Sequence, residues 1–188
     1  GYNGVETFTY TINDGTPGSD DTATVTMTVS TALPGEIDFT LYTIDPFGTQ
    51  DVSGTATVED SGATLHIVGN SWKKIDFAYT ITADTVLDFD FKSDAQGEVH
   101  GIGFDTDLVT SSDLTFALYG TQWWGIQAFR NYAGSQPDYV HYEIPIGQHY
   151  TGTSSYLFFA NDHDVASPTG ESYFSNVRVY GTAGNNPP

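Results

Sequence analysis

Apolar and polar residues alternate one by one along much of this chain, and this period of two limits the fold more than any other feature. In Leu87-Asp-Phe-Asp-Phe-Lys92, three apolar side chains alternate with three charged ones. A β-strand with this pattern has one face in a core and the other in solvent or toward a ligand. Helical periodicity is missing almost everywhere, whereas Thr, Val, Ile, Tyr and Phe are abundant. The sequence therefore predicts an all-β fold, an antiparallel β-sandwich with an N-terminal β-hairpin extension.

The expected strands are the short alternating runs that turn residues separate. They are Glu6–Ile12, Thr22–Val29, Gly54–Glu59, Thr64–Gly69, Lys73–Thr82, Val86–Lys92, Glu98–Phe104, Leu114–Leu118, Tyr139–Pro145, Tyr156–Ala160 and Tyr173–Tyr180. Asp60-Ser-Gly62 and Thr82-Ala-Asp-Thr85 have the residue types of tight turns, so we expect each of them to close a hairpin.

Composition excludes several classes of partner. The chain has 188 residues with 5 Lys+Arg against 24 Asp+Glu, a formal net charge of −19. Nucleic acids and anionic membrane surfaces need a basic footprint, so neither is an expected partner, and a neutral glycan is easier to bind than an anionic one. No run approaches the length of a membrane span, so no membrane insertion is expected. There is no cysteine, which excludes disulfides and thiolate chemistry.

The segment from Tyr119 to Tyr132 is the strongest functional signal. It contains five aromatic residues in fourteen positions and also Arg130. If it were a strand, the adjacent Trp123 and Trp124 would point to opposite faces, and at least one would meet solvent. Exposed aromatic faces beside forked donors suit a sugar ring, although a hydrophobic plug under a loop is an equally weighted alternative. The expected ligand-binding residues are Tyr119, Gln122, Trp123, Trp124, Arg130, Asn131, Tyr132 and His141, with Trp72 as a further neighbour.

Two acidic pairs are candidate metal ligands. Asp105 and Asp107 close a Gly-rich strand, and Asp162 and Asp164 follow the apolar run Tyr156–Ala160. Carboxylates at i and i+2 of a turn can converge on a hard cation, so Ca²⁺ is the expected cofactor. If both strand ends lay on one rim, the two pairs could share one ion. The alternative is that these acids cap turns through their own backbone.

Nothing in the sequence demands catalysis. The five histidines form no zinc-binding pattern, and no nucleophile elbow or phosphate-binding loop occurs. Among them, His100 and His141 could line a groove, whereas His66 fits a partly buried strand position. A β-sandwich lyase would use a Tyr/His pair, for which His141 and Tyr142 are the available residues. We therefore expect a protein that is not an enzyme, and a lyase or hydrolase of small jelly-roll type is the least favoured alternative.

The first thirty residues have a pattern of their own. Thr7-Phe-Thr-Tyr-Thr-Ile-Asn-Asp-Gly15 and Thr22-Ala-Thr-Val-Thr-Met-Thr-Val29 resemble the last two strands of bacterial cadherin-like or immunoglobulin-like repeats. The resemblance implies that residues 1–30 are the C-terminal hairpin of such a repeat. A lone hairpin is marginal in water, so it either packs on the main domain, is a remnant, or pairs with another subunit. We expect residues 31–40 and 183–188 to be linkers.

Residues 41–182 resemble a different family. The matching stretches include Gly62-Ala-Thr-Leu-His-Ile-Val-Gly-Asn-Ser-Trp-Lys-Lys-Ile75, Gly97-Glu-Val-His-Gly-Ile-Gly-Phe-Asp-Thr-Asp107, Leu118-Tyr-Gly-Thr-Gln-Trp-Trp-Gly125 and Phe158-Phe-Ala-Asn-Asp-His-Asp164. As an ordered set they are similar to carbohydrate-binding-module-like β-sandwiches of secreted and surface proteins of marine bacteria. The resemblance implies a non-catalytic jelly roll, stabilised by Ca²⁺. Many such modules have an Asp ligand where this chain has Ser175, so that ligand is absent here.

Together these observations predict an extracellular glycan-binding module, secreted or on a bacterial cell surface, that targets a parent polysaccharide-active enzyme or surface protein. Polysaccharides and other domains of a larger chain are then the expected partners. The alternative is a Ca²⁺-rigidified adhesin or structural domain that binds a protein or peptide and self-associates through the hairpin.

Overall fold

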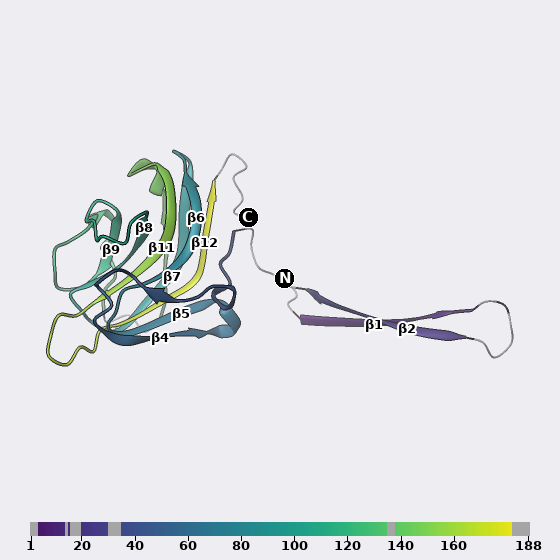
Figure 1. Cartoon of the computed structure of the whole chain (residues 1–188). Helices are drawn as coiled ribbons and strands as arrows, with labels where there is room; N and C mark the ends of the chain where they lie inside the picture. Colours follow the sequence, from purple (N-terminus) through teal and green to yellow (C-terminus); the bar gives the residue numbers. More distant parts are fainter. Residues whose placement is uncertain (1–3, 14, 16–19, 30–34, 135–137, 182–188) are drawn as a thin grey trace. The chain divides into compact units, whose positions relative to one another are not determined.

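The computed structural model describes residues 4–13, 15, 20–29, 35–134 and 138–181. The chain divides into two compact units, residues 1–33 and 34–188. Both consist of antiparallel β-structure, as the alternating sequence predicts (Figure 1). The described part of the chain contains no helix with the length and hydropathy that crossing a membrane requires.

The first unit is a hairpin with two very different faces. Strand β1 (Gly4–Ile12) pairs with β2 (Asp21–Val29), and Phe8 lies opposite Val25. Because side chains alternate along a strand, Phe8, Tyr10 and Ile12 of β1 share one face with Val25 and Met27 of β2, while Thr7, Thr9 and Thr11 lie on the other face. The exposed apolar side chains are Phe8, Tyr10, Ile12, Val25 and Met27. This confirms the predicted N-terminal hairpin, and no described residue of the hairpin unit covers its apolar face.

The second unit is a sandwich of two five-stranded antiparallel sheets (Figure 1). The β7 sheet has the order β10-β7-β12-β5-β4. Its strands are β10 (Val140–Ile144), β7 (Thr85–Ala95), β12 (Glu171–Gly181), β5 (Thr64–Asn70) and β4 (Ser53–Glu59). The β11 sheet has the order β3-β6-β11-β8-β9. Its strands are β3 (Asp45–Pro46), β6 (Lys73–Ile81), β11 (Gly152–Asp162), β8 (Val99–Asp105) and β9 (Thr115–Tyr119). Single 3-10 turns are η1 (Phe39–Leu41), η2 (Asp60–Gly62), η3 (Gln127–Phe129) and η4 (Ile146–Gln148).

The main core lies between the inner faces of the two sheets. Leu87, Phe89 and Phe91 from β7 are fully buried there, as their alternation predicts. The β11 sheet contributes Leu157 and Phe159 from its central strand. Burial of an aromatic or large aliphatic side chain stabilises a fold by about 1.5–3 kcal/mol, so this cluster is the main source of stability.

The β11 sheet also carries a second, smaller cluster on its outer face. Here the alternation along β11 brings Phe158 and Ala160 to the side opposite Leu157 and Phe159, yet both are at most 1% exposed. We call this set the outer cluster; it consists of Phe47, Trp72, Phe158 and Ala160, with the partly buried Leu108 and Trp124 packed against it. A Cβ at Gly103 would lie 2.8 Å from Phe158 Cζ and 2.0 Å from the Leu114 carbonyl oxygen, so a glycine is required beneath that ring.

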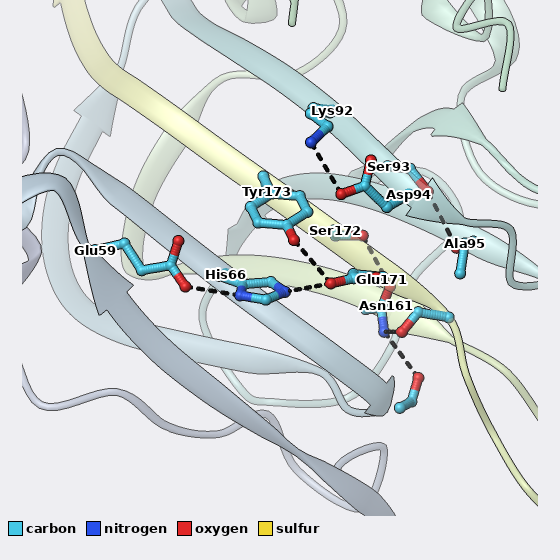
Figure 2. A network of polar contacts seen from close by, with 12 residues as sticks. Glu59, His66, Lys92, Ser93, Asp94, Ala95, Asn161, Glu171, Ser172 and Tyr173 are labelled. Carbon is cyan, nitrogen blue, oxygen red and sulfur yellow. Dashed lines mark hydrogen bonds and ion pairs between the residues drawn. The ribbon is translucent and has the colours of Figure 1, made fainter. Parts of the chain in front are cut away.

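Polar side chains cover the outer face of the β7 sheet (Figure 2). The Nδ1 atom of His66 lies 2.8 Å from Glu59 Oε1, and its Nε2 atom lies 2.8 Å from Glu171 Oε1. The Tyr173 ring stacks on the imidazole with a centroid distance of 4.0 Å, and Lys92 approaches the Tyr173 ring to 4.8 Å. The expectation that His66 is a partly buried strand residue is therefore confirmed.

Two sequence expectations need correction. The Asp60–Gly62 turn joins β4 to β5 as predicted, but the turn at Thr82–Thr85 closes no hairpin. It passes the chain from β6 in the β11 sheet to β7 in the β7 sheet, because turn residues do not determine which partner the next strand finds. Strand β3, only two residues long, was not expected.

The predicted linker at residues 31–40 is also wrong in its second half. Ile37 and Phe39 are buried in the main core, at 2% and 0% exposure, and the Ile37 amide donates to the Val177 carbonyl oxygen. The sandwich therefore begins before residue 41. Residues 31–34 and the predicted linker 183–188 lie outside the described residues.

Candidate functional site

The aromatic segment leaves β9 as a loop rather than continuing as a strand. Two backbone hydrogen bonds tie the loop to the connection between β7 and β8: Thr121 N–H donates to the Gly97 carbonyl oxygen at 3.1 Å, and Gln122 N–H donates to the Glu98 carbonyl oxygen at 2.9 Å. The loop still separates the two indoles. Trp123 is 77% exposed, whereas Trp124 is half-buried with its ring edge against Trp72 at a centroid distance of 5.7 Å.

A cavity of about 210 Å³ opens beside this aromatic pair, on the outer face of the β11 sheet. The residues that line it come from six separate segments of the chain. They are Gln50, Trp72, Val99, Thr110, Gln122, Trp124, Asp162 and Asp164. The lining thus combines indole rings, primary amides, a hydroxyl and carboxylates, which are the groups that recognise the apolar faces and the hydroxyls of a polyol.

The back wall of the cavity is rigid. Trp72 is 2% exposed, stacks on Phe158 in the outer cluster at 5.9 Å, and donates its indole N–H to Asp162 Oδ1 at 3.1 Å. Asp162 itself is 8% exposed. Burial raises the pKa of Asp162, and the negative charges of Asp164 and Glu98 act in the same direction. A buried carboxylate with acidic neighbours is the least favourable charge in the cavity, and a cation would relieve it.

Three carboxylates converge at this wall. One oxygen from each of Glu98, Asp162 and Asp164 lies within 4.8 Å of the other two. Among the described residues, these three form the group of His, Cys, Asp or Glu side chains whose ligand atoms lie close enough together to hold a metal ion. Glu98 was not among the predicted ligands.

The predicted sharing of one ion by two acidic pairs does not occur. Strand β8 runs antiparallel to β11, so Asp105 lies opposite Tyr156 while Val99 lies opposite Asp162. Six residues of strand separate the two positions, which is about 20 Å. The two acidic pairs therefore lie at opposite ends of the paired strands β8 and β11. Asp105 and Asp107 cannot join Asp162 and Asp164 around one cation.

The remaining predicted ligand residues divide between the surface and the core. Trp123 and Arg130 are neighbours, with the guanidinium carbon 5.0 Å from the indole centroid, and Arg130 also donates to the Gly120 carbonyl oxygen. Asn131 is exposed. Tyr132 is instead a core residue at 6% exposure, and Tyr119 packs edge-on against it at 5.1 Å. Of the eight predicted ligand-binding residues, Gln122 and Trp124 line the cavity, together with the predicted neighbour Trp72.

His141 and His100 do not join the site. His141 is an exposed residue of β10, in the other sheet, where Asp90 Oδ1 lies 2.9 Å from its Nδ1. His100 is fully buried, and burial lowers its pKa to about 3. Its Nε2 accepts the Gly97 N–H, so the neutral ring carries its proton on Nδ1 and donates it to Ser172 Oγ. The expectation that His100 lines a groove is wrong.

The Tyr/His pair required by a lyase is also not formed. Tyr142 and His141 are successive residues of β10 and point to opposite faces. Tyr142 is 3% exposed and stacks on Phe89 in the main core at 5.3 Å, whereas His141 faces solvent.

Sequence reasoning missed Gln50, Glu98, Val99 and Thr110. They lie in loops or at a strand end, outside the aromatic segment, and none belongs to a recognisable motif. Trp72 carried a usable signal, because it is one of only three tryptophans in the chain.

Comparison with known proteins gives similarity in solved structures only. No family model and no curated protein matches the chain. The fold is similar to a carbohydrate-binding module of family 29, with 13% identity over 74% of this chain and 78% of that chain, at a TM-score of 0.41. A structure determined with a xylogluco-oligosaccharide is similar at 14% identity over 86% of this chain and 42% of the other, with a TM-score of 0.47. The glycoside hydrolase domain of Endo-D from Streptococcus pneumoniae R6 is similar at 11% identity over 77% of this chain and 22% of that chain, with a TM-score of 0.43. At this level of likeness, the site itself has to carry the functional argument.

Proposed function

We propose that this protein is a non-catalytic glycan-binding module whose ligand enters the cavity between Trp72 and Trp124. The observation that carries the proposal is the composition of that cavity, where indole rings and amide groups face the same space. The C–H face of a sugar ring stacks on an indole, and its hydroxyls need donors and acceptors of the kind that Gln50 and Gln122 offer. Catalysis receives no support, because the candidate Tyr/His pair is split between two faces of the sandwich.

The charge of the cavity favours a neutral glycan. Asp162 and Asp164 line it and Glu98 lies next to it, whereas none of the described residues that line it is Lys or Arg. An anionic sugar such as a uronate would be repelled at short range by these carboxylates and at longer range by the net charge of −19.

Three further proposals accompany this function. Ca²⁺ remains the proposed cofactor, because carboxylate oxygens are its preferred ligands and three of them converge in the cavity wall. We also propose that the protein acts outside the cell, secreted or on a bacterial surface, and within a larger chain whose other domains it directs to a polysaccharide. The cadherin-like sequence pattern of residues 4–30 is the observation that supports the larger chain.

A glycan screen followed by calorimetry tests the function. The whole chain is applied to neutral plant and algal polysaccharides in millimolar Ca²⁺, and a ligand found there is titrated into the protein and its variants. We expect Trp124→Ala to weaken binding about tenfold or more, because loss of one stacked ring costs about 1.4 kcal/mol. Tyr139→Ala removes an aromatic that is 41% exposed just before β10, away from the cavity, and is the matched control. Normal binding by Trp124→Ala, with an unchanged fold by circular dichroism, would contradict the proposal.

A second candidate function is adhesion through the hairpin. The favouring observation is its apolar face, where Phe8, Ile12 and Met27 are each more than half exposed. Such a face on a two-stranded sheet needs a partner, which can be a protein, a peptide or a second copy. Concentration-dependent association in analytical ultracentrifugation that Phe8→Glu abolishes would support this candidate. A monomer at every concentration would remove self-association.

A further inference from the structure

Trp123 lies in the loop beside the cavity, and most of its indole is open to solvent. It is 77% exposed, whereas its two neighbours in the chain, Gln122 and Trp124, both line the cavity. Because consecutive Cα atoms are about 3.8 Å apart, the Trp123 side chain starts beside the cavity mouth. An indole left in water forgoes the free energy that its burial would give. A ligand that extends out of the cavity would bury this ring.

Arg130 supports the indole from one side. Its guanidinium carbon lies over the Trp123 ring, 5.0 Å from the centroid, and its Nη2 donates to the Gly120 carbonyl oxygen. Because the side chain is still 77% exposed with a guanidinium against one face, the other face of the ring is open. A side chain that is already held in position loses less conformational entropy when a ligand binds. The open face of Trp123 is therefore prepared for stacking.

The charge of Arg130 is used within the loop. Each of the other four Lys and Arg side chains has a nitrogen within 3.2 Å of a carboxylate oxygen. Although the chain has 24 acidic residues, no described carboxylate forms an ion pair with Arg130. Its contacts with the Trp123 ring and with Gly120 instead join the two ends of the aromatic loop. Arg130 is thus a positioning residue for the indole.

Exposed apolar side chains gather around the same cavity. In the described part of the sandwich unit, the large apolar residues that are exposed are Leu41, Val52, Val109, Trp123, Tyr139 and Val165. Four of these six lie within two residues of a cavity-lining residue, namely Val52, Val109, Trp123 and Val165. Single exposed apolar residues are ordinary on a protein surface, but a group of them beside a binding cavity marks a contact surface. The contact surface therefore extends beyond the cavity.

The cavity itself is too small for more than a short ligand. Its volume of about 210 Å³ is below the about 300–1,000 Å³ that is typical of sites for drug-sized molecules. It suits one sugar ring, and further sugar residues of the same chain have to lie outside it.

We propose that Trp123 is a second stacking platform for the same glycan. One sugar residue occupies the cavity between Trp72 and Trp124, and a following residue of the glycan crosses the loop and stacks on the open face of Trp123. This inference rests on the proposed glycan-binding function and specifies the ligand class, which is a neutral oligosaccharide or polysaccharide chain rather than a single sugar.

Calorimetry with neutral sugars of increasing length tests the proposal. The probes are glucose, cellobiose and cellotetraose, together with the corresponding mono-, di- and tetrasaccharides of mannose and of galactose. In a series that binds, we expect the affinity to rise about tenfold or more from monosaccharide to tetrasaccharide, because a second ring is stacked. Trp123→Ala should remove this gain and leave the monosaccharide affinity unchanged. Trp123→Phe should restore part of the gain, because it keeps a ring, and Tyr139→Ala is the matched control that should change neither affinity.

The outcomes separate this inference from the proposed function. Equal affinity for monosaccharide and tetrasaccharide would overturn the second platform, as would normal tetrasaccharide binding by a folded Trp123→Ala. If Trp124→Ala still abolished binding in either case, the proposed function would stand. Tetrasaccharide binding that depends on Trp123 but is normal in Trp124→Ala would overturn the path from the cavity to the loop. Absence of binding to all three series by the unmodified protein would overturn the inference and the proposed function together.

Discussion

Replacing Phe158 by alanine tests whether the outer cluster is a second core. Phe158 is 1% exposed, and its ring lies 4.6 Å from the Phe47 centroid and 5.9 Å from the Trp72 centroid. A buried Phe side chain removes about 150–250 Å² from water, which at about 25 cal/mol per Å² is worth about 4–6 kcal/mol. Measured Phe-to-Ala costs in cores are about 3–5 kcal/mol. We therefore expect the free energy of unfolding of Phe158→Ala to fall by about 4 kcal/mol.

Urea denaturation followed by tryptophan fluorescence measures this loss, and the melting temperature should fall by about 8–16 °C. Phe89→Ala in the main core is the positive control, because Phe89 is fully buried between the sheets. Leu41→Ala is the negative control, since Leu41 is 78% exposed and its truncation should change stability by less than about 0.5 kcal/mol. A cost below about 1 kcal/mol for Phe158→Ala would show that the outer face of the β11 sheet carries no independent core.

Two further substitutions probe charges in the sandwich. Asp105 is 3% exposed, and its Oδ2 has no hydrogen-bond partner among the described residues. Burial raises the pKa of Asp105. Its charged form therefore destabilises the fold above that pKa, and this effect is lost as the carboxyl group is protonated at lower pH. Asp105→Asn should therefore stabilise the protein by about 1 kcal/mol at pH 7.5, with the gain disappearing toward pH 4 in urea denaturation; a gain that grows on acidification would contradict this. His66→Phe keeps a ring against Tyr173 but removes both contacts to Glu59 and Glu171, and should lower the free energy of unfolding by about 1–2 kcal/mol. An unchanged melting temperature would show that the network is only a surface feature.

The sequence was a good guide to strands and a poor guide to which residues meet. Alternating burial is a local property, so runs such as Leu87–Lys92 predict both the strand and its buried face. Pairing is not local. The turn at Thr82–Thr85 has hairpin residues, yet β6 and β7 pair in different sheets because their buried faces meet across the core. The register of β8 against β11 separates Asp105 from Asp162. The spacing within each acidic pair is local and does not predict this register.

The same limit applies to the candidate site. The predicted exposure of at least one indole is confirmed by Trp123, and the tryptophan pair correctly drew attention to the loop that borders the cavity. Tyr119 and Tyr132 were wrongly predicted to face a ligand. The residue type alone does not distinguish an aromatic side chain that packs in a core from one that contacts a sugar. Glu98 could not be found from sequence, because its position depends on backbone hydrogen bonds among three distant segments.

The residues that line the cavity are of two kinds, and this affects how such a module can diversify. Trp72 is packed in the outer cluster and forms the back wall, whereas Gln50, Thr110 and Gln122 come from loops and form what we call the rim. Trp72 belongs to the outer cluster, so a mutation there would change ligand preference and thermodynamic stability together. Gln50, Thr110 and Gln122 stand outside both hydrophobic clusters, so they are free to vary with little effect on folding. Adaptation to a new polysaccharide would therefore begin with substitutions at these three side chains, while Trp72 is substituted more slowly. Directed evolution that randomises only the rim should return folded variants with altered selectivity at high frequency.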